Sequence, residues 1–187
     1  MSNIGTTRRD LLPFGNINID DIPEFTEENK PKNHRGRIEY NSQVCAFDIE
    51  TTGLPEIQQS VMYIWQFAIE DLVIIGRTWE EFRTLIGWLN EKAGGRRIVV
   101  YVHNLSYEFQ FISGILHFDN EAVFSMDSRK VLKAVYENIE FRCSYLLTNL
   151  SLKALTKRYN VEHQKLSGEE FDYSVRRFSD TELTDEV

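Results

Sequence analysis

Two acidic residues end an apolar stretch of the chain in a pattern that suits cation binding. Asp48 and Glu50 alternate with Phe47 and Ile49, and residues two apart on a β-strand point to the same side, about 6 to 7 Å apart. Two carboxylates at that distance repel each other unless a cation lies between them. Their hard oxygen atoms favour Mg²⁺ or Mn²⁺ over zinc. For this short pattern alone, ordinary acids at a solvent-exposed strand end are the alternative.

A second group of polar residues follows another apolar stretch. Residues 98–102 read Ile-Val-Val-Tyr-Val, which is typical of a parallel strand buried on both faces. This stretch leads into His103, Asn104, Tyr107 and Glu108, and sites in open α/β sheets form at such carboxyl ends of strands. Glu108 would complete a three-carboxylate site with the first pair. A helix N-terminus that favours an acid explains Glu108 alone, and turn or boundary positions explain the other three.

The rest of the pattern predicts the elements that would position these residues. Thr78 and Glu81 form a capping-box pattern, and apolar residues follow at helical spacing until Gly94. Ser106 is a candidate N-cap for a second helix. The predicted elements are strands 43–49, 61–69, 72–76 and 98–102, helices from Thr78 to Gly94, from Ser106 to Leu116 and from Leu150 to Tyr159, and a hairpin over 123–141 that turns near Glu137 and Asn138. This order predicts an α/β sheet with mixed pairing.

Length and composition favour one globular domain. The chain has 187 residues, 42% hydrophobic and 27% charged, and no apolar run approaches the roughly 20 residues that span a bilayer. No secretory signal follows the N-terminus, so we expect a cytoplasmic protein, in the host cytoplasm if it is viral. Residues 1–40 are polar, contain three prolines and lack periodicity, which predicts a flexible leader. Residues 41–187 form the predicted domain.

The charge balance gives little reason to expect tight non-specific binding of nucleic acid by the whole chain. Its formal net charge is -8, which repels a polyanion. Three local basic clusters, at 96–97, 153–158 and 176–177, are interpreted as solvated faces. Cys45 and Cys143 have the spacing of two buried thiols rather than of a disulfide framework or a zinc site.

The two acidic segments together resemble a known family. Residues 47–51, Phe-Asp-Ile-Glu-Thr, resemble the first motif of DnaQ-like, DEDD-type 3′–5′ exonucleases. Residues 101–108, Tyr-Val-His-Asn-Leu-Ser-Tyr-Glu, resemble the second motif in the form used by protein-primed family B DNA polymerases of phages. Ser144 and Tyr145 resemble the single-strand-binding motif of that subfamily, and Lys165 resembles its lysine motif. The resemblance covers residues from about 44 to the end of the chain.

This resemblance implies a fold and an activity. The fold would be a ribonuclease H-like mixed sheet with flanking helices and an inserted β-hairpin. The activity would be two-metal hydrolysis of 3′-terminal nucleotides from single-stranded DNA, for proofreading during viral DNA replication. The implied metal ligands for Mg²⁺ or Mn²⁺ are Asp48, Glu50 and Glu108, and Lys165 would approach the scissile phosphate. The implied DNA-binding residues are Thr51, His103, Asn104, Tyr107, Ser144 and Tyr145.

The sequence departs from the family pattern at three points. Glu108 stands where Asp is usual, and Tyr145 stands where Leu is usual. The third exonuclease motif, Tyr-x-x-x-Asp, is not found, because Asp172, Asp180 and Asp185 all lack a Tyr four residues earlier. We therefore expect an exonuclease-like domain that is incomplete at its C-terminus, with a metal site that lacks its last carboxylate and a reduced activity.

These features leave three hypotheses. The first is the exonuclease domain of a longer protein-primed DNA polymerase, whose partners would be a single-stranded 3′ end, the polymerase domain of the parent chain and a terminal protein. The second is a non-catalytic module that binds single-stranded nucleic acid with the same fold, motivated by Glu108 and by the missing motif. The third and weakest is a free-standing DEDD ribonuclease.

Overall fold

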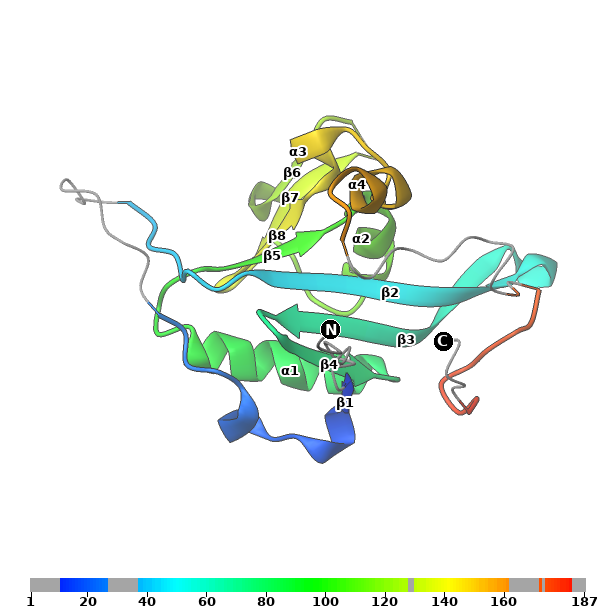
Figure 1. Cartoon of the computed structure of the whole chain (residues 1–187), viewed down its shortest axis with the longest axis horizontal. Helices are drawn as coiled ribbons and strands as arrows, with labels where there is room; N and C mark the ends of the chain where they lie inside the picture. Colours follow the sequence, from blue (N-terminus) through cyan, green and yellow to red (C-terminus); the bar gives the residue numbers. More distant parts are fainter. Residues whose placement is uncertain (1–10, 27–36, 128–129, 162–171, 173, 183–187) are drawn as a thin grey trace, which may run out of the picture.

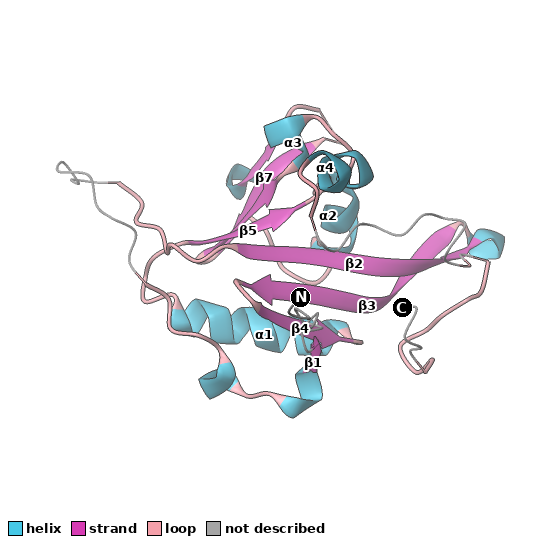
Figure 2. Ribbon diagram, viewed as in Figure 1, coloured by secondary structure: helices cyan, strands magenta, loops and turns pink. Residues whose placement is uncertain are grey.

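A mixed eight-stranded sheet runs through the protein in the spatial order β1-β4-β3-β2-β5-β8-β7-β6 (Figure 1). The computed structural model describes residues 11–26, 37–127, 130–161, 172 and 174–182. The strands are β1 Leu11–Pro13, β2 Cys45–Leu54, β3 Gln59–Ile69, β4 Leu72–Gly76, β5 Ile98–Val102, β6 Val123–Ser125, β7 Val131–Tyr136 and β8 Ile139–Cys143. The helices described are α1 Trp79–Lys92, α2 Ser106–Ile112, α3 Tyr145–Thr148 and α4 Leu152–Arg158, with 3₁₀ turns η1 Phe14–Asn16, η2 Ile19–Asp21, η3 Pro55–Ile57 and η4 Asn120–Ala122. Figure 2 shows how the helices surround the sheet.

Parallel pairing joins the three strands at the centre of the sheet. Cys45 of β2 lies beside Val100 of β5, and Val100 lies beside Phe141 of β8. The outer strands pair antiparallel, except β1, which runs parallel to β4. The mixed pairing predicted from the sequence is therefore confirmed, and so is the hairpin turn at Glu137 and Asn138, which joins β7 to β8.

One face of the sheet forms the core. A row of residues crosses four adjacent strands, and Cys45, Val100, Phe141 and Ala134 in this row are each 0% exposed. Since successive side chains of a strand point to opposite faces, the residues next to this row point away from the core. Burial of this apolar face is the main favourable contribution to folding.

Helix α1 covers this face with the apolar stripe that the sequence predicts. The ring centroid of Phe82 lies 4.8 Å from that of Phe47 on β2. The predicted capping box is present, because Thr78 Oγ1 accepts a hydrogen bond from the Glu81 amide at 3.2 Å and Glu81 Oε2 accepts one from the Thr78 amide at 2.8 Å. The buried residues of the helix are Phe82, Leu85, Ile86 and Leu89.

Helix α2 lies beside α1 on the same face. Phe109 of α2 packs on Phe118, with ring centroids 5.2 Å apart, and Phe118 packs on Phe141 at 6.3 Å. Trp79 of α1 and Phe111 of α2 stack with centroids 6.4 Å apart. Among the described residues, no helix has the length and apolar character needed to cross a membrane.

Two elements differ by more than two residues at one end from the sequence prediction. Strand β2 extends to Leu54 instead of ending at Ile49, because β3 pairs with it along its whole length. Helix α2 ends at Ile112 instead of Leu116. Gly114 follows the end of α2, and glycine costs about 1 kcal/mol in a helix interior relative to alanine, which disfavours continuation.

Residues 11–26 are structured, which differs from the expected flexible leader. Strand β1 pairs with β4, and the ring of Phe14 stacks on Trp88 of α1 with centroids 5.0 Å apart. Ile22 and Phe25 are 1% and 6% exposed within the core. Phe14 packs against the core, whereas Ile22 and Phe25 lie within it, and the spacing of these residues has no helical or strand period that the sequence could show.

We expect Gly76 to be intolerant of any side chain. A Cβ at this position would lie 2.1 Å from Cζ2 of Trp65, and Trp65 cannot move easily because it is fully buried and its Nε1 donates to the Thr78 carbonyl at 2.9 Å. Gly76→Ala should therefore lower the free energy of unfolding by about 1 to 3 kcal/mol, as measured by urea denaturation.

Gly87 provides the matched control. It lies inside α1, and an added Cβ would meet nothing within 4 Å. Gly87→Ala should raise the free energy of unfolding by about 0.5 to 1 kcal/mol, because alanine is the better helix former. Equal effects of the two substitutions would contradict the packing described around Trp65.

Candidate active site at the carboxyl ends of the parallel strands

Strand β2 presents two acids on the face opposite the core. Phe47 and Ile49 are 2% and 5% exposed and belong to the core, whereas Asp48 and Glu50 are half-buried on the other side. The alternation predicted from the sequence is therefore confirmed. The pairing with β3 shifts register between Glu50 and Thr51, and such irregularities re-aim side chains, often beside active sites.

The end of β5 forms a tight turn before α2. Asn104 is exposed and has a φ of 67°, a left-handed conformation that asparagine tolerates better than most residues. The carbonyl of Asn104 accepts a hydrogen bond from the amide of Tyr107 at 3.0 Å. The predicted cap is wrong in detail: the hydroxyl of Ser106 makes no cap bond and instead accepts one from the amide of Val131 on β7 at 3.0 Å.

A hydrogen bond joins the first predicted segment to the second. Thr51 Oγ1 and Tyr107 Oη are 2.6 Å apart, although the two residues are 56 positions apart in the sequence. Tyr107 is 38% exposed. Two of the predicted DNA-binding residues thus meet, one from β2 and one from α2.

A second contact joins the end of β5 to the end of β8. His103 Nδ1 and Ser144 Oγ are 3.3 Å apart, and the ring of Tyr145 meets the His103 ring edge-on with centroids 5.8 Å apart. The pairing of Val102 with Cys143 explains this meeting, because the next residue on each strand leaves the sheet at the same level. The structure therefore brings together three more of the predicted residues.

Glu108 lies on the buried side of α2 and is 4% exposed. Its position in the first turn of the helix agrees with the prediction. Burial of a carboxylate is costly unless charge or hydrogen bonding compensates it. A carboxylate oxygen is also the type of ligand that a hard divalent cation prefers. Within the described part of the chain, however, no group of three or more His, Cys, Asp or Glu side chains is placed to hold a metal ion. The three-carboxylate metal site therefore stays a prediction, and Lys165 lies outside the described residues.

The two cysteines take no part in this cluster. Cys45 is fully buried and Cys143 is half-buried, and both are free. Burial, with a smaller contribution from the charge of Glu70, raises the pKa of the Cys45 thiol to about 12. The thiol is therefore protonated at neutral pH and is a weak nucleophile.

A set of arginine contacts, which no pattern in the sequence indicated, holds residues 174–182 against the hairpin formed by β2 and β3. Arg176 donates from both terminal nitrogens to the two carboxylate oxygens of Glu56, each at 2.7 Å. Arg77 donates to the carbonyls of Tyr63, Phe178 and Thr181 at 2.7 to 2.8 Å. Arg176 of the basic cluster at 176–177 therefore makes a structural ion pair. This ion pair could not be predicted from the sequence because Arg176 and Glu56 are 120 positions apart.

A buried ion cluster fixes β8 beside the start of β5. The side chain of Glu140 is 2% exposed and accepts from Arg97 Nη1 at 2.8 Å and from Arg142 Nε at 2.7 Å. Tyr40 Oη donates to the same carboxylate at 3.3 Å. Burial alone would raise the pKa of Glu140, but the hydrogen bonds from Arg97 and Arg142 outweigh it, so the pKa lies below its usual value of 4.5.

Comparisons with known proteins place this arrangement among known folds. No protein-family model matches the sequence, and no curated protein matches it. Among solved structures, phi29 DNA polymerase complexed with single-stranded DNA is similar, with a TM-score of 0.59, 16% identity and 77% of this chain covered. Phi29 DNA polymerase complexed with primer-template DNA gives a TM-score of 0.58 at the same identity and coverage.

The fold is ribonuclease H-like. The mixed sheet, its flanking helices and the β7–β8 hairpin agree with the fold class predicted from the sequence. This chain covers 28% of the length of the polymerase chains to which it is similar. At 16% identity the likeness concerns the fold alone.

We expect Glu140→Gln to destabilise the protein in a pH-dependent way. A glutamate with a lowered pKa in the folded state stabilises that state above pH 4.5, and this contribution is lost as the pH falls through the lowered value. At pH 7 the substitution should cost about 3 kcal/mol, because it leaves two partly buried guanidinium groups without their anion. The difference from the wild type should shrink as the pH falls below 4.5.

Denaturant unfolding at several pH values measures this difference. Glu91→Gln, an exposed position on α1, is the control and should change the unfolding free energy by less than about 0.5 kcal/mol. A pH-independent effect of Glu140→Gln would show that the carboxylate charge does not stabilise the fold.

Proposed function

We propose that this chain is a 3′–5′ exonuclease domain of the kind found in protein-primed DNA polymerases, acting on single-stranded DNA in viral DNA replication. One observation carries the proposal. The segments that resemble the two exonuclease motifs and the single-strand-binding motif meet where β5 and β8 end and where β2 continues past its parallel pairing with β5, through the contacts of Thr51 with Tyr107 and of His103 with Ser144. Carboxyl ends of parallel strands are where open α/β sheets bind their ligands.

In this proposal, Asp48, Glu50 and Glu108 hold Mg²⁺ or Mn²⁺. The ions would supply Lewis-acid stabilisation of the phosphate and a water molecule of lowered pKa. The rigid strand positions Asp48 and Glu50, since their neighbours Phe47 and Ile49 are locked in the core. Lys165 is proposed as a point charge that approaches the scissile phosphate.

The remaining residues are proposed to hold the 3′ end of the DNA. Tyr107 is exposed enough to pack against a base or sugar, and its hydroxyl is already oriented by Thr51. Asn104 is exposed at the tip of the turn, where its amide can form hydrogen bonds. Tyr145 and His103 would add a second aromatic contact supported by Ser144. Stacking tolerates any base, as proofreading requires.

The similar structures support DNA as the partner. They are complexes of a DNA polymerase with single-stranded and with primer-template DNA. A polymerase domain in a longer parent chain, and a terminal protein as a further partner, belong to the same proposal.

A non-catalytic module that binds single-stranded nucleic acid is the second candidate. One feature favours it, namely Glu108 where the family has Asp. It shares the DNA-binding residues with the first candidate and differs in the metal-dependent step. Metal binding and hydrolysis therefore separate the two.

We expect metal binding and hydrolysis to depend on the first two acids. Asp48→Asn and Glu50→Gln keep the shape of each side chain but remove a charged oxygen ligand. Each should weaken Mn²⁺ binding, measured by calorimetric titration, and should slow hydrolysis of a 5′-labelled single strand by about 100-fold or more. Products should shorten from the 3′ end only.

Glu80→Gln is the matched control, because Glu80 is an exposed acid of α1 on the other side of the sheet. It should leave both measurements unchanged. If metal binding and hydrolysis are unchanged when Asp48 and Glu50 are both substituted, the exonuclease proposal is wrong. Binding of single-stranded DNA with no Asp48-dependent metal binding would favour the non-catalytic module.

A further inference from the structure

The face of the sheet away from the core carries a row of aromatic and basic residues. Phe124 of β6 pairs with Lys133 of β7, Lys133 with Arg142 of β8, and Arg142 with Tyr101 of β5. Directly paired residues on neighbouring strands point to the same face. These four residues therefore form one line across four strands, which we call the Phe124–Tyr101 row.

This row is the outward counterpart of the core row. Its neighbours by one position, Val100, Phe141 and Ala134, are 0% exposed. Phe124 is 59% exposed, the Arg142 side chain is 37% exposed, and Lys133 and Tyr101 are half-buried. With strands about 4.8 Å apart, the row spans about 14 Å of accessible sheet surface.

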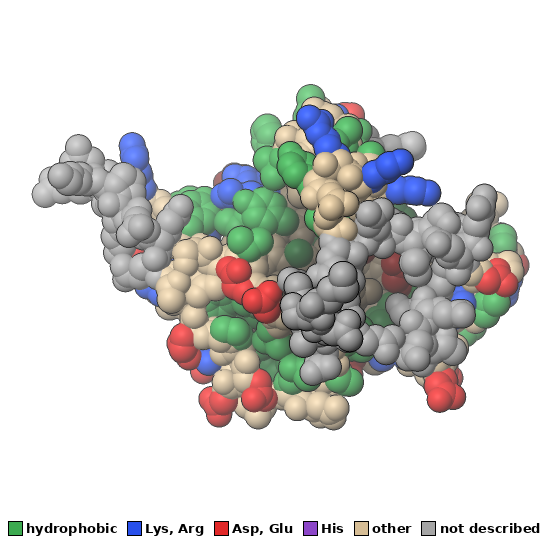
Figure 3. Space-filling view, viewed as in Figure 1, with side chains coloured by type: hydrophobic (Ala, Val, Ile, Leu, Met, Phe, Trp, Pro, Cys, Tyr) green, Lys and Arg blue, Asp and Glu red, His purple; other side chains and the backbone are tan. Residues whose placement is uncertain are grey.

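The row is electropositive although the chain is acidic. In and beside the row, the cations Lys133, Arg142 and Arg97 surround a single anion, Glu140, which gives a local net charge of +2 within a chain of -8. On the face visible in Figure 3, Lys and Arg side chains gather mostly at the top, over α3 and α4, and Asp and Glu side chains lie mostly below them. The row therefore attracts a polyanion more than the net charge suggests.

Glu140 organises the cations of this face without cancelling them. It is the buried anion between Arg97 and Arg142, and Arg142 also lies over the ring of Tyr40, 5.2 Å from its centroid. Among the described residues, the Lys133 side chain has no ion-pair or hydrogen-bond partner, although its charge helps to lower the pKa of Glu140. Three cations thus surround one anion.

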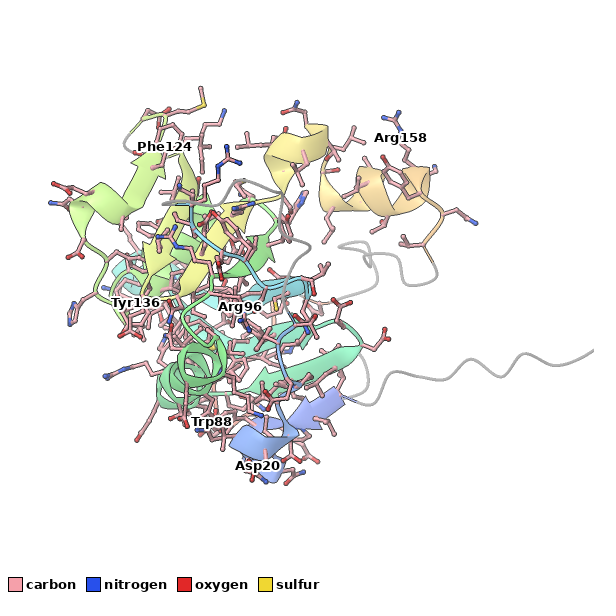
Figure 4. All side chains as sticks on the ribbon, turned by 90° about the vertical axis from the view of Figure 1, so that its left-hand side faces the viewer. Asp20, Trp88, Arg96, Phe124, Tyr136 and Arg158 are labelled. Atoms are coloured by element: carbon pink, nitrogen blue, oxygen red, sulfur yellow. The ribbon has the colours of Figure 1, made fainter. Side chains whose placement is uncertain are left out.

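The row also has the right position and chemistry for a single strand. Tyr101 pairs with Ala46, and Ala46 precedes Asp48 by two residues on the same side of β2, so the row leads toward the candidate active site. Phe124, labelled in Figure 4, lies on β6, which is the edge strand of the sheet, so it forms the end of the row away from β2. Exposed aromatic residues on a four-stranded sheet can stack two or three bases, while cations between them bind the phosphates.

We propose that the Phe124–Tyr101 row binds single-stranded DNA upstream of the 3′ end held at the candidate active site. This inference rests on the proposed function for the direction of the strand, and Lys133, Arg142 and Phe124 are its new contact residues. Lys133 and Arg142 bind phosphates, and Phe124 stacks on a base.

The test measures binding of a fluorescently labelled 12-nucleotide oligo-dT by anisotropy, in EDTA so that hydrolysis cannot occur. Lys133→Glu should raise the dissociation constant by about tenfold and lower the salt slope by about 1. Phe124→Leu should weaken binding by about fivefold or more, whereas Phe124→Tyr should not, because it keeps the stacking ring. Thermal melting should confirm that each variant is folded.

Arg83→Glu is the matched control. Arg83 is an exposed cation on α1, against the opposite face of the sheet, so the same change in net charge should alter binding by less than about twofold. Equal effects of Lys133→Glu and Arg83→Glu would overturn the proposal, because only net charge would then matter. Tighter binding of duplex than of single-stranded DNA would also overturn it.

This outcome is separable from that of the proposed function. If Lys133→Glu loses DNA binding and the wild type shows no metal-dependent hydrolysis, DNA binding by the row is supported and the exonuclease proposal is contradicted. If hydrolysis depends on Asp48 but substitutions in the row leave DNA binding unchanged, the exonuclease proposal is supported and DNA binding by the row is contradicted.

Discussion

The register of three parallel strands is the constraint on which the rest of the protein depends. The pairs of Cys45 with Val100 and of Val100 with Phe141 decide at once which residues enter the core and which face outward. A slip of one residue would exchange the two faces of a strand, exposing Phe47 and burying Asp48. Nothing local to any one strand imposes this alignment. It is held by the core rings of α1 and α2 on one face and by the Glu140 cluster on the other.

Those parts of the fold with a local cause were predictable from the sequence. The alternation around Asp48, the apolar run of β5 and the capping box of α1 each follow from residues within a few positions of one another. The resemblance of the motif segments then indicated which ends of the strands belong together. The fold class followed from these signals, and the contact of Thr51 with Tyr107 agrees with that grouping.

The remainder depends on residues that only the folded chain brings together. No periodic pattern in the sequence indicates the stacking of Phe14 on Trp88, the burial of Ile22, the pairing of Arg176 with Glu56 or the hydrogen bond from Val131 to Ser106. The cation cluster around Glu140 is hidden for the same reason, because Arg97, Lys133 and Arg142 come from three different strand regions. Their shared surface exists only once the register is known.

The outer strand β6 shows how the protein combines an exposed aromatic residue with a low risk of aggregation. It has only three residues, and its pairing with β7 shifts register after Phe124, so it presents few unpaired backbone groups in a straight line. Long, flat edge strands invite strand addition by other chains, whereas short and irregular ones do not. Phe124 and Met126, 59% and 66% exposed, therefore stand at the rim of the sheet without offering a template on which copies of the protein could polymerise.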